Sequence, residues 1–265
     1  MKSFTSRSFA TIILLLLCMG VQAQCKQKNT AFQSGEYLSY NLYYNWKMVW
    51  VRAGTASCGI IQSSRQGQPA YRASLTVTSN KKADDMFIMR DTILSYSTLD
   101  LEPIYYRKGS RENKRYTVDE VFYSNKGGKT SLRLHRQHHN GTHTWQNKTS
   151  SQCVYDMLNV LLRLRSYDFS SWAKGKHIEL PIATGKALTS ARVSFKGETT
   201  IKVDDGKKYN CLMLSYIENK DGKYKETVRF YVTNDNRHIP VRIDFFLRFG
   251  TAKAYLTSMK GTKAL

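Results

Sequence analysis

The sequence has few acidic residues, and it lacks an apolar run long enough to cross a membrane as a helix. Aspartate and glutamate together number 20, against 41 lysines and arginines. The longest apolar run lies near the N-terminus and is shorter than the ~20 residues that a bilayer-spanning helix needs. We therefore expect no transmembrane segment in the mature protein. An acidic cleft would also have few candidate side chains.

The sequence also lacks the motifs by which several enzyme classes are recognised. It contains no Gly-x-Ser-x-Gly nucleophile elbow, no His-Glu-x-x-His zinc motif, no phosphate-binding loop and no dinucleotide-binding glycine pattern. These absences favour a noncatalytic protein, and we expect no cofactor. The paired carboxylates of a glycosidase have no motif of their own. A carbohydrate-active or other hydrolase that uses carboxylates such as Glu36, Asp156 and Asp235 therefore remains the alternative.

The first 23 residues have the features of a secretory signal peptide. Lys2 and Arg7 precede an apolar run over residues 12–19, and small residues suit cleavage between Ala23 and Gln24. We expect the mature protein to be periplasmic or secreted, and residues 24–265 to form a single β-rich domain. A split into two β halves around a central helix is the alternative.

Four cysteines follow this cleavage site, and their spacing does not fix their pairing. An oxidising compartment permits disulfides, but four cysteines allow three pairings, and some of them could instead be small buried apolar residues. Lipidation at Cys18 or Cys25 is not expected, because a bulky residue precedes each of them where a lipidation site needs a small one. The four residues are Cys25, Cys58, Cys153 and Cys211.

The chain is strongly basic. Its net charge is +21, and it stays near +19 after signal removal because only Lys2 and Arg7 leave. A field of this sign attracts polyanions, so we expect a lipid, a glycan or another anionic component of the bacterial envelope as a partner. The alternative is that the basic residues merely solvate the outer faces of strands. Nucleic acid is not expected, because the chain is exported and has no nucleic-acid-binding motif.

Alternation of apolar and polar residues dominates the chain from Gly35 onward. Leu38, Tyr40 and Leu42 fall on one face of an extended segment, and the same pattern recurs over residues 71–78 and 241–249. Turn residues separate such runs, as at residues 125–128, 204–206 and 219–222. The pattern predicts a mainly β protein, with a large curved antiparallel sheet or a partly open β-barrel. The charged stretch over residues 108–115 suits a loop.

One segment has helical spacing instead. Apolar residues recur every three or four positions over about residues 151–165, behind possible caps at Ser150 or Ser151, and Arg163 and Arg165 fall in the last turn. This pattern predicts one amphipathic helix packed against the sheet.

Three separated blocks of the sequence resemble the DUF3108 family of exported bacterial proteins without known function. They are Phe32–Leu38 with Trp50–Gly54, Val154–Leu158 with Leu164–Arg165, and Tyr231–Val241. The resemblance implies an envelope location and a β-rich fold with a helix. It supplies no catalytic residues.

Two groups of residues are candidates for a site. Glu36, Asp156, Asp235 and Arg237 lie in the three blocks and could converge at one end of the sheet to bind a polar ligand, although turns and caps also use such residues. Three histidines around the turn Asn140-Gly141 are weak candidates for a metal site, and an exposed polar hairpin is the alternative. These histidines are His135, His139 and His143.

Together these features predict a noncatalytic envelope protein. Its curved sheet would present a concave, tyrosine-rich surface that binds an amphiphilic or anionic ligand.

Overall fold

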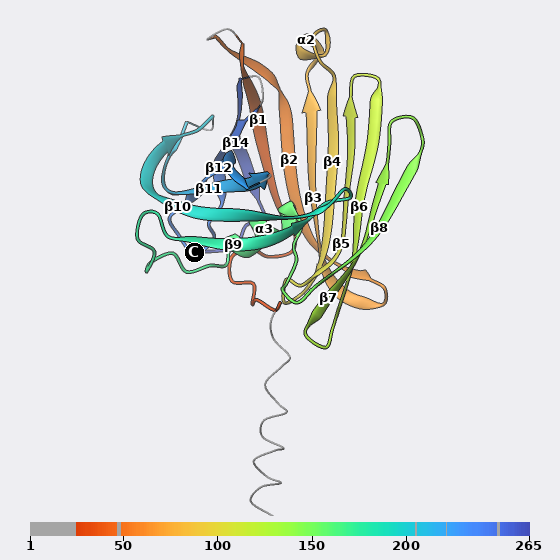
Figure 1. Ribbon diagram of the computed structural model, residues 1–265. Helices are drawn as coiled ribbons and strands as arrows, with labels where there is room; N and C mark the ends of the chain where they lie inside the picture. Colours follow the sequence, from red (N-terminus) through yellow and green to blue (C-terminus); the bar gives the residue numbers. More distant parts are fainter. Residues whose placement is uncertain (1–24, 47–48, 205, 221, 248–249) are drawn as a thin grey trace, which may run out of the picture.

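The structure is a computed structural model that describes residues 25–46, 49–204, 206–220, 222–247 and 250–265 (Figure 1). The predicted signal peptide and its cleavage site lie outside the described residues. Among the described residues, fourteen strands form one sheet. They are β1 (Glu36–Trp46), β2 (Val49–Arg65), β3 (Gln68–Ser79), β4 (Met89–Thr98), β5 (Pro103–Glu112), β6 (Arg115–Lys126), β7 (Lys129–Gln137), β8 (His143–Ser150), β9 (His177–Ala183), β10 (Leu188–Lys202), β11 (Lys208–Lys220), β12 (Lys223–Thr233), β13 (Pro240–Phe246) and β14 (Thr251–Lys260).

The chain starts in the middle of this sheet. It runs outward strand by strand from β1 to β8 at one edge, crosses to β9 at the other edge, and returns to β14 beside β1. Every paired neighbour is antiparallel. The prediction of a mainly β fold with a large antiparallel sheet is therefore confirmed.

The sheet curls without closing. Its two edge strands, β8 and β9, are not hydrogen-bonded to each other, but the β9–β10 turn reaches the opposite half of the sheet. Gln146 Nε2 of β8 donates to the carbonyl oxygen of Lys186 at 3.2 Å. A Cβ on Gly185 would lie 2.3 Å from the carbonyl oxygen of His135, so only glycine permits this approach of the turn to β7.

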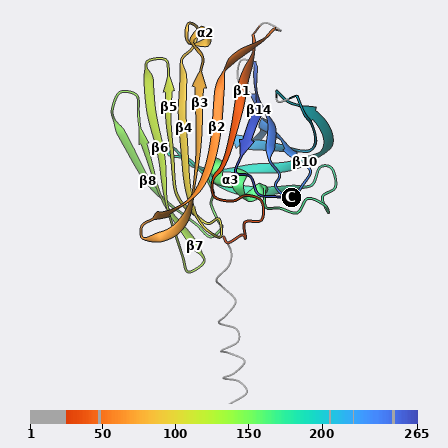
Figure 2. The ribbon, with the colours of Figure 1, turned by 180° about the vertical axis from the view of Figure 1, so that it is seen from behind.

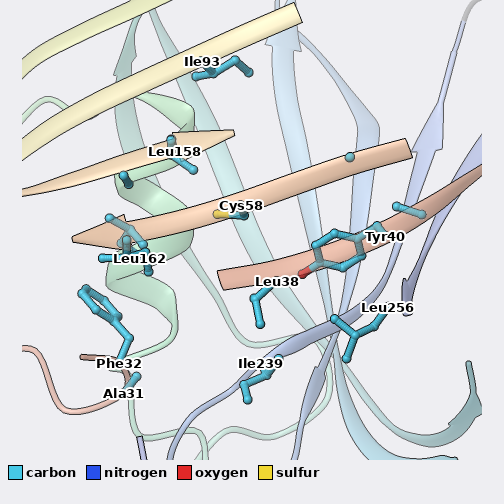
Figure 3. Packing of buried hydrophobic residues seen from close by; sticks show 14 of the residues in the cluster. Ala31, Phe32, Leu38, Tyr40, Cys58, Ile93, Leu158, Leu162, Ile239 and Leu256 are labelled. Atoms are coloured by element: carbon cyan, nitrogen blue, oxygen red, sulfur yellow. The ribbon is translucent and has the colours of Figure 1, made fainter. Parts of the chain in front are cut away.

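Two helices accompany the sheet among the described residues: α2 (Lys81–Asp84), between β3 and β4, and α3 (Met157–Leu164), in the crossing from β8 to β9. Leu158 and Leu162 of α3 pack against strand residues that include Leu38, Cys58 and Ile93 (Figure 3). A second apolar cluster joins the same helix to β11 and β12. The predicted packing of one amphipathic helix on the sheet is confirmed. Neither helix is long and apolar enough to cross a membrane.

The predicted start of this helix is wrong. The cap is Asp156 rather than Ser150 or Ser151, because its carboxylate accepts hydrogen bonds from the backbone N–H groups of Leu158 and Asn159 at 3.0 and 2.8 Å. The residues just before the cap are extended, since Tyr155 pairs with the edge of β9. Residues 151–156, which the prediction included, are therefore not helical.

The structure selects one cysteine pairing. Cys25 and Cys153 form a disulfide, which joins the N-terminal segment to the approach to α3. Cys58 and Cys211 are buried free thiols. Two of the four cysteines are therefore disulfide-bonded, and the other two are small buried residues, so both of the predicted alternatives occur.

Candidate functional site

The C-terminal end of α3 gathers three of the four residues that sequence reasoning assigned to a ligand site. Arg165 donates to both carboxylate oxygens of Glu36 at 2.5 and 2.9 Å, and its Nε donates to the carbonyl oxygen of Arg237 at 3.0 Å. Arg237 in turn pairs with Asp235 at 2.8 Å. The side chains of Arg165 and Glu36 are only 3% and 1% exposed. This arrangement holds the helix against β1 and the β12–β13 turn.

Asp156 lies at the other end of the same helix. An eight-residue helix is about 12 Å long, so this carboxylate does not join the Glu36 group. It is fully buried, caps α3 and accepts a hydrogen bond from Ser95 at 2.9 Å. Burial raises the pKa of Asp156 to about 6, although the hydrogen bonds from Asn159, Ser95 and Leu158 act in the opposite direction.

The Asp156 carboxyl should make stability depend on pH. Its pKa is above the usual value near 4, so the folded protein holds the proton more tightly, and stability falls as pH rises from about 4 to about 6. Asparagine keeps the capping oxygen without the charge. We expect Asp156→Asn to be more stable than wild type by about 2–3 kcal/mol at pH 7 but not at pH 4, measured by urea unfolding. The same dependence of the free energy of unfolding on pH in both proteins would contradict this expectation. Asp156→Ala, which removes the charge and also the helix cap, is the control.

Two of the three candidate histidines meet on the outer face of the sheet. His135 Nδ1 lies 2.7 Å from Glu120 Oε2, and its Nε2 lies 2.8 Å from His143 Nδ1. The ring of Trp145 stacks on His135 with the centroids 4.0 Å apart. Burial favours a raised pKa for Glu120, but hydrogen bonds from Tyr105 and His135 outweigh it and lower this pKa.

His139 takes no part in this chain of contacts. It lies in the exposed β7–β8 turn. Within the described residues, no group of three histidine, cysteine or carboxylate side chains is placed to hold a metal ion. The contacts of His135 and His143 instead form a carboxylate–imidazole–imidazole chain.

A third site, which sequence reasoning missed, lies near one end of β4, β5 and β6. The sheet register places Arg90 opposite Arg111, and Arg111 opposite Tyr116, so these side chains share the outer face. They surround a hollow of about 590 Å³. We call it the basic hollow, and its lining residues are Arg90, Thr92, Arg107, Gly109, Arg111, Lys114 and Tyr116.

The missing side chain of Gly109 keeps this hollow open. A Cβ there would lie 2.8 Å from the Tyr116 hydroxyl and 3.1 Å from Nη1 of Arg107. Arg107 Nη2 donates to that hydroxyl at 3.1 Å, and Arg111 Nε donates to the carbonyl oxygen of Asn113 at 3.2 Å. Among the described residues neither arginine forms an ion pair with a carboxylate, whereas Arg90 pairs with Asp84 at 2.5 Å. The guanidinium groups of Arg107 and Arg111 therefore retain further N–H groups that can donate hydrogen bonds to an anion.

The sequence signal for this hollow was the charged stretch over residues 108–115. The prediction of a loop there is wrong except for the turn at Asn113 and Lys114, because the rest belongs to β5 and β6. Its charged residues tolerate a strand because the outer face of these strands meets solvent.

Comparisons with known proteins agree with this fold. The DUF3108 family model, described as a protein of unknown function, matches residues 39–257. The search of curated proteins found no match. A crystal structure of a β-barrel-like protein of the domain of unknown function DUF1849 from Brucella abortus is similar with a TM-score of 0.56 and 9% identity, over 87% of this chain and 99% of that one. This likeness shows the fold alone.

A second crystal structure has a weaker similarity. It is described as "a putative lipoprotein from Parabacteroides distasonis ATCC 8503" and has a TM-score of 0.30 and 12% identity, over 89% of this chain and 99% of that one. No argument follows from a similarity at this level.

Proposed function

Since this chain belongs to the DUF3108 family, whose function is unknown, we propose its role from the site itself: it is a noncatalytic bacterial envelope protein that binds an anionic group in the basic hollow. The observation that carries this proposal is the convergence of four cationic side chains on one hollow, where Arg107 and Arg111 form no salt bridge among the described residues, although the carboxylates of Glu120 and Asp84, respectively, interact with them electrostatically. Guanidinium groups bind phosphate and carboxylate with paired donors. The net charge of +21 attracts such ligands from a distance.

The envelope location has two supports. The N-terminal residues have the pattern of a signal peptide. The disulfide between Cys25 and Cys153 fits an oxidising compartment, because cytosolic thiols are kept reduced. The same bond supports a form without lipid at Cys25, because a sulfur in a disulfide cannot also carry a lipid thioether.

The packing favours binding on the outer face over binding on the concave face. Leu158 and Leu162 of α3 already cover the inner side of β1, β2 and β4. The hydrolase alternative is also less favoured, since the three candidate carboxylates already have structural partners. Glu36 pairs with Arg165, Asp235 pairs with Arg237, and Asp156 caps the helix.

Replacing Arg107 and Arg111 tests the hollow. We expect Arg107→Gln/Arg111→Gln to bind inorganic phosphate at least about tenfold more weakly than wild type, because the charge-assisted donors are lost. Titration followed by NMR would measure the affinity, and the shifted signals should belong to the lining residues. The control is Arg72→Gln/Lys126→Gln, which removes the same charge from exposed positions outside the hollow. Equal weakening in both variants, or in neither, would refute a specific site.

A further inference from the structure

Large apolar side chains are exposed at three turns at one end of the sheet. We call them the apolar tips: Val49, Trp50 and Val51 after the β1–β2 turn, Met86 and Phe87 between α2 and β4, and Leu247 after β13. Their exposed fractions are 61%, 40%, 41%, 61%, 45% and 48% in that order. Clustered exposed apolar groups of this kind mark interaction surfaces more often than single ones do.

The three turns are neighbours in space. In the register, Tyr44 of β1 lies opposite Val51 on one side and opposite Ala252 on the other, which brings the start of β14 beside the β1–β2 turn. Asn80, at the start of α2, donates through its backbone to Ala53 and through its side chain to Arg52. Two opposite views place α2 and the β1–β2 hairpin at the same end of the sheet (Figures 1 and 2).

The turns at the opposite end differ in composition. The β2–β3 turn consists of Gln66 and Gly67, and the β6–β7 turn consists of Gly127 and Gly128 after Lys126. Leu99 in the β4–β5 turn is exposed by 42%, whereas Tyr37 and Ile61, two other exposed apolar residues described toward this end, lie within strands β1 and β2 rather than in turns, at 46% and 42%. Polar and glycine residues therefore suffice to make turns in this sheet, and the apolar tips need another explanation.

Basic residues surround the apolar tips. The ammonium group of Lys253 lies 4.1 Å from the ring centroid of Trp50, and Arg52, Lys81 and Lys82 are exposed nearby. Among the described residues, the exposed acidic side chains in this region are Asp85, Glu112 and Asp204, and Asp204 accepts hydrogen bonds from Asn41 and Tyr43 of β1. The balance of charge favours an anionic surface.

The basic hollow adjoins the same end. Ile88, next to Phe87, exchanges two hydrogen bonds with Asn113, at 2.8 and 2.9 Å. Asn113 lies between Arg111 and Lys114 of the hollow. The segment that carries Phe87 is thus hydrogen-bonded to the turn beside the hollow. Exposed apolar side chains and an anion site therefore lie next to each other, as in a peripheral membrane-binding surface.

We propose that this end of the sheet docks on a bilayer that carries anionic phospholipids. The apolar tips enter the interfacial region, and the basic hollow receives a headgroup phosphate. This inference takes its headgroup contact from the proposed function, and its apolar contact stands on the tips alone.

Vesicle cosedimentation tests the docking. We expect the full mature chain to bind vesicles of phosphatidylcholine with about one-third phosphatidylglycerol, and to bind pure phosphatidylcholine at least about tenfold more weakly. Met86→Ser/Phe87→Ser should lower the affinity for the anionic vesicles by about tenfold or more while leaving the binding of inorganic phosphate unchanged. Leu99→Ser, a matched exposed position at the other end, should bind as wild type does.

The outcomes separate the two proposals. A wild-type protein that ignores anionic vesicles, or a Met86→Ser/Phe87→Ser variant that binds them as tightly as wild type, overturns the docking even if phosphate binding depends on Arg107 and Arg111. Vesicle binding that depends on the tips without any phosphate binding in the hollow supports the docking and overturns the proposed function. Circular dichroism of each variant confirms that its fold is unchanged.

Discussion

Arg165→Met is expected to lower the free energy of unfolding by about 3–5 kcal/mol, which is a large share of the stability of an ordinary domain. Methionine fills much of the space of arginine but leaves the Glu36 carboxylate buried without its counter-charge. It also removes the hydrogen bond to the carbonyl oxygen of Arg237, so that the C-terminal end of α3 loses both of its links to the sheet through this side chain. Denaturant unfolding followed by tryptophan fluorescence measures the change.

Two further variants separate the ion pair from general packing. Glu36→Gln in the Arg165→Met background should recover part of the loss, because it removes the unpaired charge. The exposed pair of Arg192 and Glu179 provides the control: Arg192→Met should cost less than about 1 kcal/mol, since solvent screens that pair. An Arg165→Met variant that loses no more stability than Arg192→Met would show that the buried pair contributes little.

The features predicted from sequence are those that depend on neighbours along the chain. Alternation placed Leu38, Tyr40 and Leu42 on one face, and all three are buried in the core. The period of 3.6 residues found the helix that contains Leu158 and Leu162, because both residues point to one side of it. The spacing of apolar and polar residues within one strand or helix is enough to identify that element without knowledge of the strands it packs against.

The rest depends on contacts between distant residues. Nothing local shows that β1 pairs with β14, or that Arg165 meets Glu36 across 129 positions. Asp156 was a better cap than Ser150 only because Tyr155 is held on the edge of β9. The start of α3 was therefore set by tertiary structure.

The basic hollow illustrates the same limit. Arg107 and Arg111 fall on one face by parity, but Arg90 comes from another strand and reaches them only through the β4–β5 register. The charged stretch over residues 108–115 favours a loop because the sequence pattern alone does not show that the outer face of these strands meets solvent. The basic residues of the hollow become neighbours only through the pairing of β4 with β5.

Loss of the disulfide between Cys25 and Cys153 is expected to lower the free energy of unfolding by about 2–5 kcal/mol. The bond closes a loop with a sequence separation of 128 residues, and the chain-entropy model gives about 5 kcal/mol for a loop of this size. Contacts that remain in its absence set the lower end of the range. The carbonyl oxygen of Cys25 still accepts a hydrogen bond from Arg163 at 2.8 Å, and Gln27 still donates to the carbonyl oxygen of Arg163.

Thiol labelling provides both the measurement and the control for this prediction. Burial raises the pKa of Cys58 and of Cys211 to about 11, so very little of either thiol is the reactive thiolate at neutral pH. Iodoacetamide should therefore label neither of them in the folded protein, and should label both, but not Cys25 or Cys153, after unfolding without reductant. Cys25→Ser/Cys153→Ser should unfold at a lower denaturant concentration than wild type and match wild type treated with reductant. Labelling of Cys25 and Cys153 before reduction, or an unfolding midpoint that reductant does not change, would show that the bond is absent or contributes nothing, and would remove the support that it gives to an oxidising compartment.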